Sequence, residues 1–102
     1  MVGVSPATIV LATAALYLDL AGRDLRAALA GGRSLADVTE SRRRSLAGLE
    51  RAVLNALRRT RAWERPTAAA VDHVLELAAE GWTNWQALVD RVIYTQVLGR
   101  AA

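Results

Sequence analysis

The sequence predicts an all-α fold, a compact bundle of about six short helices with a helix-turn-helix-like centre. Apolar residues make up 53% of the chain and are mainly Ala, Leu and Val, whereas aromatic residues make up only 5%. Such side chains pack helices closely and offer little of the surface that favours strands. Apolar residues also recur every three or four positions between Gly, Ser and Pro, as in short amphipathic helices. We expect one domain over residues 1–102, since this length supports a single core.

The first two helices are marked by a capping serine and by glycines. Ser5 followed by Pro6 predicts a helix start, because the hydroxyl caps free amides and the proline pre-sets φ. This helix is expected to run to about Leu20 and to be ended by Gly22. A short helix is then expected at residues 24–30, before a Gly-Gly pair.

The next two helices should also begin at serines. Ser34 opens a helix that stops near Ser41, with Asp37 placed three residues on in a shortened capping box. Ser45 caps a long helix. The apolar stripe of that long helix consists of Leu46, Leu49, Val53, Leu57 and Thr60.

A C-terminal helix pair is expected at residues 66–98. Pro66 forces a boundary and begins a helix that Gly81 closes. Its inward residues are Val71, Val74, Leu75 and Ala78. Thr83 and Gln86 suggest a capping box for the last helix. The buried face of that helix is expected to be Leu88, Val89, Val92, Ile93 and Val97.

Residues 12–57 resemble a small helical repeat found in bacterial proteins of unknown function. The resemblance is carried by residues 14–18 (AALYL), residues 25–38 (LRAALAGGRSLADV), Ser45 and Leu49. They are similar to a Leu-x-x-x-Leu-x-x-Gly-x-Ser-Leu-Ala-Asp-Ile/Val core that precedes a helix-turn-helix-like pair. The resemblance implies a compact helical unit and supplies no catalytic residue.

This chain departs from the similar sequences at several turns. They usually have glycine where it has Asp19 and Arg43, a helix cap at Ala21 and alanine at Thr39. Glycine tolerates the left-handed backbone conformation, whereas an arginine in this conformation lowers the stability of the fold by about 1 kcal/mol or more. We therefore expect the loop at residues 42–44 to be wider than in the similar unit.

Positive charge is concentrated in one window. Every basic residue is an arginine, and residues 42–65 hold eight arginines against Glu50 and Glu64. The window has a net charge of +6 on a chain whose total is +3. Its arginines are Arg42, Arg43, Arg44, Arg51, Arg58, Arg59, Arg61 and Arg65.

Nucleic-acid binding is the sharpest hypothesis for this window. Arg44, Arg51, Arg58 and Arg65 recur every seven residues, so they fall near one side of the long helix and could follow phosphates. The alternative is a solvated helix face, with neighbouring glutamates as local partners and arginine stems over apolar neighbours. Base-specific readout is not expected, because the exposed positions at the helix start lack bidentate side chains. Those positions are Ser45, Ala47 and Gly48.

A protein-interaction or assembly role is the competing hypothesis. Trp63, Trp82 and Trp85 lie at or beside expected helix ends, and tryptophan is enriched in interface hot spots. The alternative is that these rings fix the helix ends to the core, above all Trp85. A mean hydropathy of +0.17 also favours a protein partner or a homo-oligomer, because one small bundle hides limited apolar surface.

An enzyme is the weakest hypothesis. His73 is the only histidine. Together with Asp72 and Glu76 it offers about two ligands on one helix face, whereas a metal site requires at least three protein ligands. Phosphate loops, nucleophile elbows and metalloprotease motifs are absent from the sequence. We predict a non-enzymatic protein with no metal, no cofactor and no small-molecule substrate.

The expected compartment is the cytoplasm. The chain has no cysteine, which suits an intracellular protein. The apolar run at residues 7–18 is shorter than the roughly 20 residues a bilayer requires. No basic residue precedes Arg23, as a signal peptide would need. We therefore expect a buried helix and no membrane partner.

Overall fold

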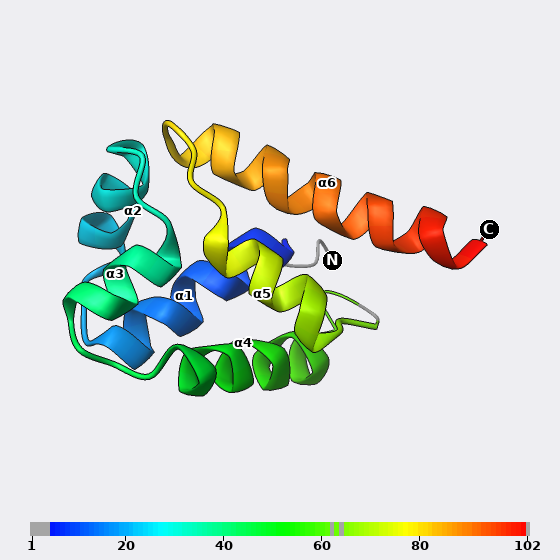
Figure 1. Cartoon of the computed structure of the whole chain (residues 1–102), viewed down its shortest axis with the longest axis horizontal. Helices are drawn as coiled ribbons and strands as arrows, with labels where there is room; N and C mark the ends of the chain where they lie inside the picture. Colours follow the sequence, from blue (N-terminus) through cyan, green and yellow to red (C-terminus); the bar gives the residue numbers. More distant parts are fainter. Residues whose placement is uncertain (1–4, 62, 64, 102) are drawn as a thin grey trace.

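The computed structural model describes the backbone of residues 5–61, 63 and 65–101, and the side chains of the last helix as far as residue 95. This part of the chain contains six α-helices and no strand, which confirms the predicted all-α class (Figure 1). The helices are α1 (Pro6–Leu18), α2 (Gly22–Ala30), α3 (Leu35–Ser41), α4 (Leu46–Thr60), α5 (Ala68–Glu76) and α6 (Trp82–Ala101).

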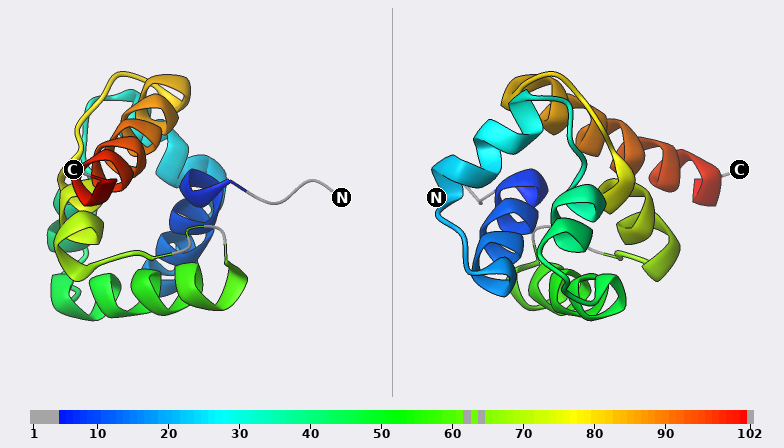
Figure 2. Two further views of the ribbon diagram at one scale, coloured as in Figure 1. Left: turned by 90° about the vertical axis from the view of Figure 1, so that its right-hand side faces the viewer. Right: turned by 60° about the vertical axis from the view of Figure 1, so that its left-hand side comes forward.

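The helices form a ring of four that α2 and α3 close at one end. Helices α4 and α6 lie on opposite sides, and each contacts both α1 and α5 (Figures 1 and 2). Helix α2 contacts α1 and α6, while α3 contacts α4 and α5. The Cα radius of gyration is 12.8 Å, close to the roughly 13 Å of a compact domain of this length. The helix-turn-helix-like centre is α3 and α4, which residues 42–45 join.

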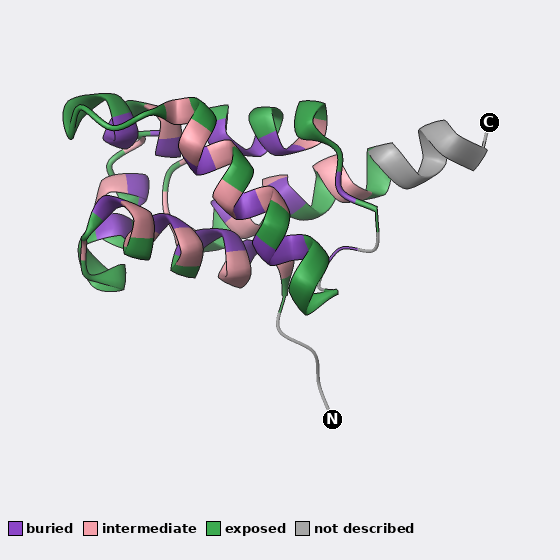
Figure 3. Ribbon diagram, turned by 90° about the horizontal axis from the view of Figure 1, so that it is seen from below, coloured by how far each residue is buried: buried purple, intermediate pink, exposed green. Residues whose placement is uncertain are grey.

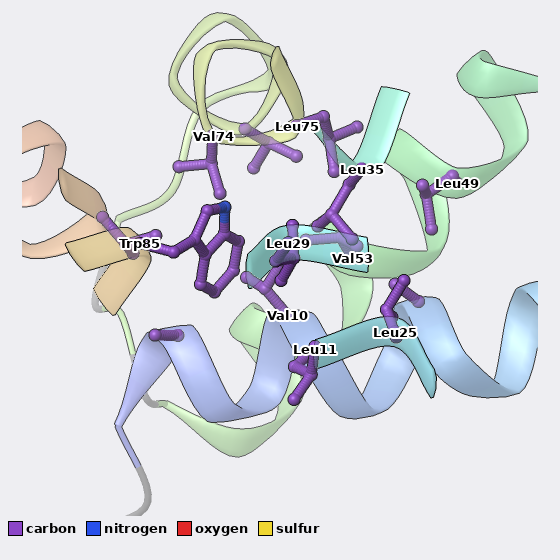
Figure 4. Packing of buried hydrophobic residues seen from close by; sticks show 14 of the residues in the cluster. Val10, Leu11, Leu25, Leu29, Leu35, Leu49, Val53, Val74, Leu75 and Trp85 are labelled. Carbon is purple, nitrogen blue, oxygen red and sulfur yellow. The ribbon is translucent and has the colours of Figure 1, made fainter. Parts of the chain in front are cut away.

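The core is built around the indole of Trp85. Figure 4 shows this ring pointing inward toward Val10 of α1, Leu29 of α2 and Val74 of α5. Trp85 is 0% exposed, and its Nε1 has no hydrogen-bond partner among the described residues. Burial of one large apolar side chain contributes about 1.5–3 kcal/mol to the free energy of unfolding. The packing of Trp85 against three other helices is therefore a main contribution to the stability of the fold.

Hydroxyl caps begin four of the helices. The side chains of Ser5, Ser34, Ser45 and Thr67 each accept a hydrogen bond from the backbone N–H three residues on. The three serine caps were predicted from sequence and are confirmed. Asp37 completes the capping box by accepting from the Ser34 N–H at 3.1 Å, and these hydrogen bonds hold its pKa below the ordinary value.

The ends of the first helices differ slightly from the sequence expectation. Helix α1 stops at Leu18 rather than near Leu20, because Asp19 takes the left-handed conformation. Gly22, which we expected to end this helix, is instead the first residue of α2. Thr60 was placed on the apolar stripe of α4 but is exposed, and its hydroxyl donates to the Ala56 carbonyl at 2.7 Å.

The boundaries of the C-terminal pair were less well predicted. Helix α5 begins at Ala68 because Thr67, and not Pro66, supplies the cap. It ends at Glu76, so residues 77–81 form a loop, and Ala78 is exposed rather than inward. Thr83 lies inside α6, so it cannot serve as the predicted cap. Val71, Val74, Leu75 and Val89 are buried as expected, Leu88, Val92 and Ile93 are half-buried, and the Val97 side chain lies outside the described residues.

The turn between α3 and α4 contains a left-handed arginine. The backbone of Arg43 has a φ of 57°. Asp19 and Arg61 are also left-handed, with φ values of 55° and 56°. Its N–H donates to the Glu40 carbonyl at 2.9 Å, which closes the turn directly after α3. Arg43 therefore adopts the conformation whose cost led us to expect a wider loop, and the turn is closed by a backbone hydrogen bond. The width of this loop relative to the similar unit stays a prediction.

Arg43→Gly should raise the free energy of unfolding by about 1 kcal/mol, since glycine has no Cβ to clash in the left-handed conformation. Thermal denaturation should show a Tm higher by about 4–8 °C. Arg44→Gly is the matched control, because it removes the same charge from the same loop at a residue without positive φ. An equal gain in the control would mean that charge, rather than backbone strain, is responsible.

Close contact between α1 and α4 depends on Gly48. The Tyr17 hydroxyl donates to the Ser45 carbonyl at 2.9 Å. A Cβ at Gly48 would meet the hydroxyl oxygen and would lie 3.1 Å from the ring Cζ. Glycine at this position therefore lets the tyrosine cross the first turn of α4 and fixes the helix on α1.

A double-mutant cycle of Gly48→Ala and Tyr17→Phe should give a coupling energy of about 1 kcal/mol, the net value of one hydrogen bond. Alanine should be less favourable when the tyrosine hydroxyl is present, as measured by urea denaturation. Gly22→Ala serves as the control, because nothing lies within 4 Å of a Cβ there. Additive effects of the two changes would contradict this role of Gly48.

Candidate nucleic-acid interface on helix α4

Helix α4 has one buried side and one exposed side because it packs against both α1 and α5. The buried residues are Leu49, Val53, Ala56 and Leu57. The exposed residues are Ala47, Arg51, Asn55, Arg58, Arg59 and Thr60. Figure 3 views the molecule from the α4 side and shows exposed positions along this helix. The amphipathic pattern therefore directs three arginines to solvent.

We call Arg51, Arg58 and Arg59 the arginine face. Arg51 and Arg58 are two helical turns apart, which corresponds to about 10.5 Å along the axis. Neither these two residues nor Arg59 makes a side-chain hydrogen bond or ion pair with any described residue. Their guanidinium groups are thus free to donate to an external anion.

The carboxyl group nearest in sequence does not neutralise the arginine face. Glu50 is the only acidic residue of α4, and its carboxyl group faces Asp72 of α5. The hydrogen bond between these two side chains raises the pKa of Glu50, and partial burial and repulsion from Asp72 raise it further. Pairing of Glu50 with an arginine of its own helix, the alternative reading of the sequence, is therefore not observed. Glu64, the second expected partner, lies outside the described residues.

The arginines of the α3–α4 turn have different roles. Arg42 donates from Nε to the Leu18 carbonyl at 2.7 Å, which ties the turn to the end of α1. Arg43 adopts the left-handed conformation, and Arg44 is exposed beside the capping Ser45. Arg42 is thus partly structural, whereas Arg44 extends the positive charge toward the start of α4.

Two further arginines follow the C-terminal end of α4. Arg61 is its left-handed C-cap, and Arg65 is exposed one residue before Pro66. Arg58 and Arg59 occupy the last helical turn, where positive charge also interacts favourably with the helix dipole. All eight predicted arginines are exposed, but only those of the arginine face share one helix side.

The tryptophans are mainly core residues. Trp63 is 5% exposed and Trp85 is 0% exposed, so neither ring is presented to a partner, contrary to the interface assignment. Trp82 is half-buried, stacked on Trp85 with ring centroids 5.4 Å apart. The Arg26 guanidinium lies 4.9 Å from the Trp82 ring centroid. Large flat side chains at helix ends join helices here, which is why their position in the sequence resembled an interface.

The acidic residues beside His73 do not gather around it. Asp72 turns to Glu50 on α4, whereas His73 lines a cavity toward α6. Within the described part of the chain, no three His, Asp or Glu side chains are placed to hold a metal ion.

A cavity between α5 and α6 was not predicted from sequence. Its volume is about 530 Å³, and it is lined by Ala69, Ala70, His73, Leu77, Leu88, Arg91, Val92 and Thr95. Small residues at neighbouring positions of α5 were the available signal. These small residues did not suffice to predict a cavity, because the sequence does not show which face of α6 packs opposite them.

Comparison with protein-family models, with curated proteins and with solved structures gives no match to this chain. Among the described residues, no helix combines the length and the apolar character needed to cross a membrane.

Glu50→Gln should raise the Tm at pH 7, because the amide can donate to Asp72 without the repulsion between two carboxylates. A raised pKa means that the folded state binds the Glu50 proton more tightly than the unfolded state. The protonated Glu50 carboxyl therefore stabilises the folded state. This contribution to the free energy of unfolding is fully present below pH 4.5, the ordinary pKa of a glutamate, and is lost as pH rises through the raised pKa of Glu50.

Thermal melts between pH 3 and pH 7 should therefore show the gain from Glu50→Gln shrinking toward low pH. Glu40→Gln, at an exposed glutamate of α3, is the control. An equal gain at every pH would contradict the raised pKa of Glu50 beside Asp72.

Proposed function

We propose that this chain is a non-enzymatic binding module that holds nucleic acid, or another polyanion, on the arginine face of α4. The observation that carries the proposal is that Arg51, Arg58 and Arg59 are exposed on one helix side without partners among the described residues. Guanidinium groups bind phosphate through charge-assisted, often bidentate hydrogen bonds. Release of condensed counterions from the nucleic acid supplies most of the affinity.

Binding through the phosphate backbone fits the site better than reading of bases. Ser45 uses its hydroxyl to cap α4 and its carbonyl to accept from Tyr17. Gly48 has no side chain and is covered by the same tyrosine. The start of α4 therefore offers no side chain for bidentate base contacts, and we expect little preference for sequence.

Arg51→Ala with Arg58→Ala should weaken binding of a fluorescent mixed-sequence DNA duplex at least tenfold. The slope of log K against log salt should become shallower by about 2, since roughly one counterion is released for each phosphate contact. Fluorescence anisotropy across a salt series measures both quantities, and the matching single strand shows whether a duplex is required.

Arg23→Ala with Arg33→Ala is the matched control, because it removes two exposed arginines outside α4. It should change the affinity much less than the α4 pair. Circular dichroism must show that both double variants remain folded. Absence of binding by the native chain at low salt, or equal losses in the two variants, would remove the nucleic-acid proposal.

A protein-interaction role is the second candidate, and exposed apolar side chains favour it. Leu16 of α1 is 85% exposed and Tyr94 of α6 is 65% exposed. Association through such residues responds weakly to salt, whereas phosphate contacts weaken steeply as salt rises. The salt series therefore separates the two candidates.

A further inference from the structure

The cavity between α5 and α6 lies away from the arginine face. Helices α5 and α6 lie side by side, joined by residues 77–81, and α4 is on the opposite side of the molecule from α6 (Figures 1 and 2). Ala69, Ala70 and His73 line the cavity from α5, with Leu77 directly after the helix. The cavity volume of about 530 Å³ falls within the roughly 300–1,000 Å³ of small-molecule sites.

Small side chains on α5 account for the space. The lining residues of α6 are Leu88, Arg91, Val92 and Thr95, whose spacing of three, four and seven places them on one helix side. Such a side normally packs against large residues of a neighbouring helix. Here α5 presents Ala69 and Ala70, which cannot fill the gap, so apolar walls remain accessible from outside.

The polar side chains among the described lining residues are an arginine, a histidine and a threonine. Most of the wall is apolar, while His73 and Arg91 contribute nitrogen donors from facing helices and Thr95 adds a hydroxyl. None of the described residues that line the cavity carries a carboxylate. An apolar cleft that is lined by one guanidinium and by two further hydrogen-bonding side chains is complementary to a ligand with an apolar chain and an anionic head.

We propose that this cavity binds a small amphiphilic carboxylate, with its apolar chain between α5 and α6 and its carboxylate at Arg91 and His73. The site is independent of the proposed polyanion face. A helix from a partner fits less well, because two turns of a helix about 10 Å across occupy roughly 800 Å³. A flexible chain of about ten carbons enters a narrower space and buries its surface against the same leucine, valine and alanine side chains.

Titration calorimetry with sodium decanoate, below its micelle concentration, tests the proposal. We expect saturable one-to-one binding, with no comparable binding of decyltrimethylammonium, which has the same chain and the opposite charge. Arg91→Met keeps the apolar stem and removes the guanidinium, so it should weaken decanoate binding about tenfold. Arg23→Met is the control at an exposed arginine of α2 and should leave the affinity unchanged.

The position of the ligand is tested by filling the cavity. Ala70→Leu should abolish decanoate binding, whereas Ala87→Leu, at an exposed position of α6 outside the lining, should preserve it. Thermal melts of both variants check that they fold. In ¹H–¹⁵N NMR spectra of the native chain, decanoate should shift the amide signals of Ala70 and Val92 and leave that of Arg51 in place.

Three results would overturn the proposal. The first is the absence of saturable decanoate binding, and the second is equal binding of the cationic probe. The third is self-association of the native chain that is lost in Ala70→Leu, because this result would assign the cavity to a second copy of the chain. Arg51→Ala with Arg58→Ala should bind decanoate normally. Failure at this cavity and failure of the polyanion proposal are therefore distinguishable.

Discussion

Burial of one side of α4 against α1 and α5 is the constraint on which the rest of the molecule depends. Leu49, Val53 and Leu57 occupy one stripe of the helix and are fully buried. Because helical geometry fixes the remaining positions, Arg51 and Arg58 must then point to solvent. The hydrogen bond from Tyr17 to the Ser45 carbonyl, which requires Gly48, adds a polar contact at the start of the same interface.

The positive charge of the chain is held by an ordered framework. Ser45 caps α4 at one end, and Arg61 ends it in a left-handed conformation at the other. Arg42 anchors the preceding turn to the Leu18 carbonyl. A helix that is fixed at both ends in this way presents its arginines at defined spacings, which would reduce the conformational entropy lost in the proposed binding of a polyanion. The pairing of Glu50 with Asp72 keeps the one carboxyl group of α4 occupied by another helix.

Much of the N-terminal half could be predicted, because its signals are local. Serine hydroxyls mark three helix starts, and apolar residues at helical spacing mark the stripe of α4. The C-terminal pair was harder to place. Pro66 and Gly81 suggested boundaries, yet the Thr67 hydroxyl sets the start of α5 and the chain leaves the helix at Glu76. The burial of Trp63 depends on packing between helices, which local spacing does not report.

The sequence by itself determined the helical class, most caps, the apolar stripes and the exposed arginines, because each follows from residues within one or two turns. Tertiary structure decided which stripes meet. Tyr17 reaches a carbonyl 28 residues away, and Glu50 meets Asp72 across two helices. The cavity likewise exists only because residues of both α5 and α6, among them Ala70 and Val92, line the same space. Periodicity states which side of a helix is apolar, but the partner of that side is fixed by how all six helices share one core.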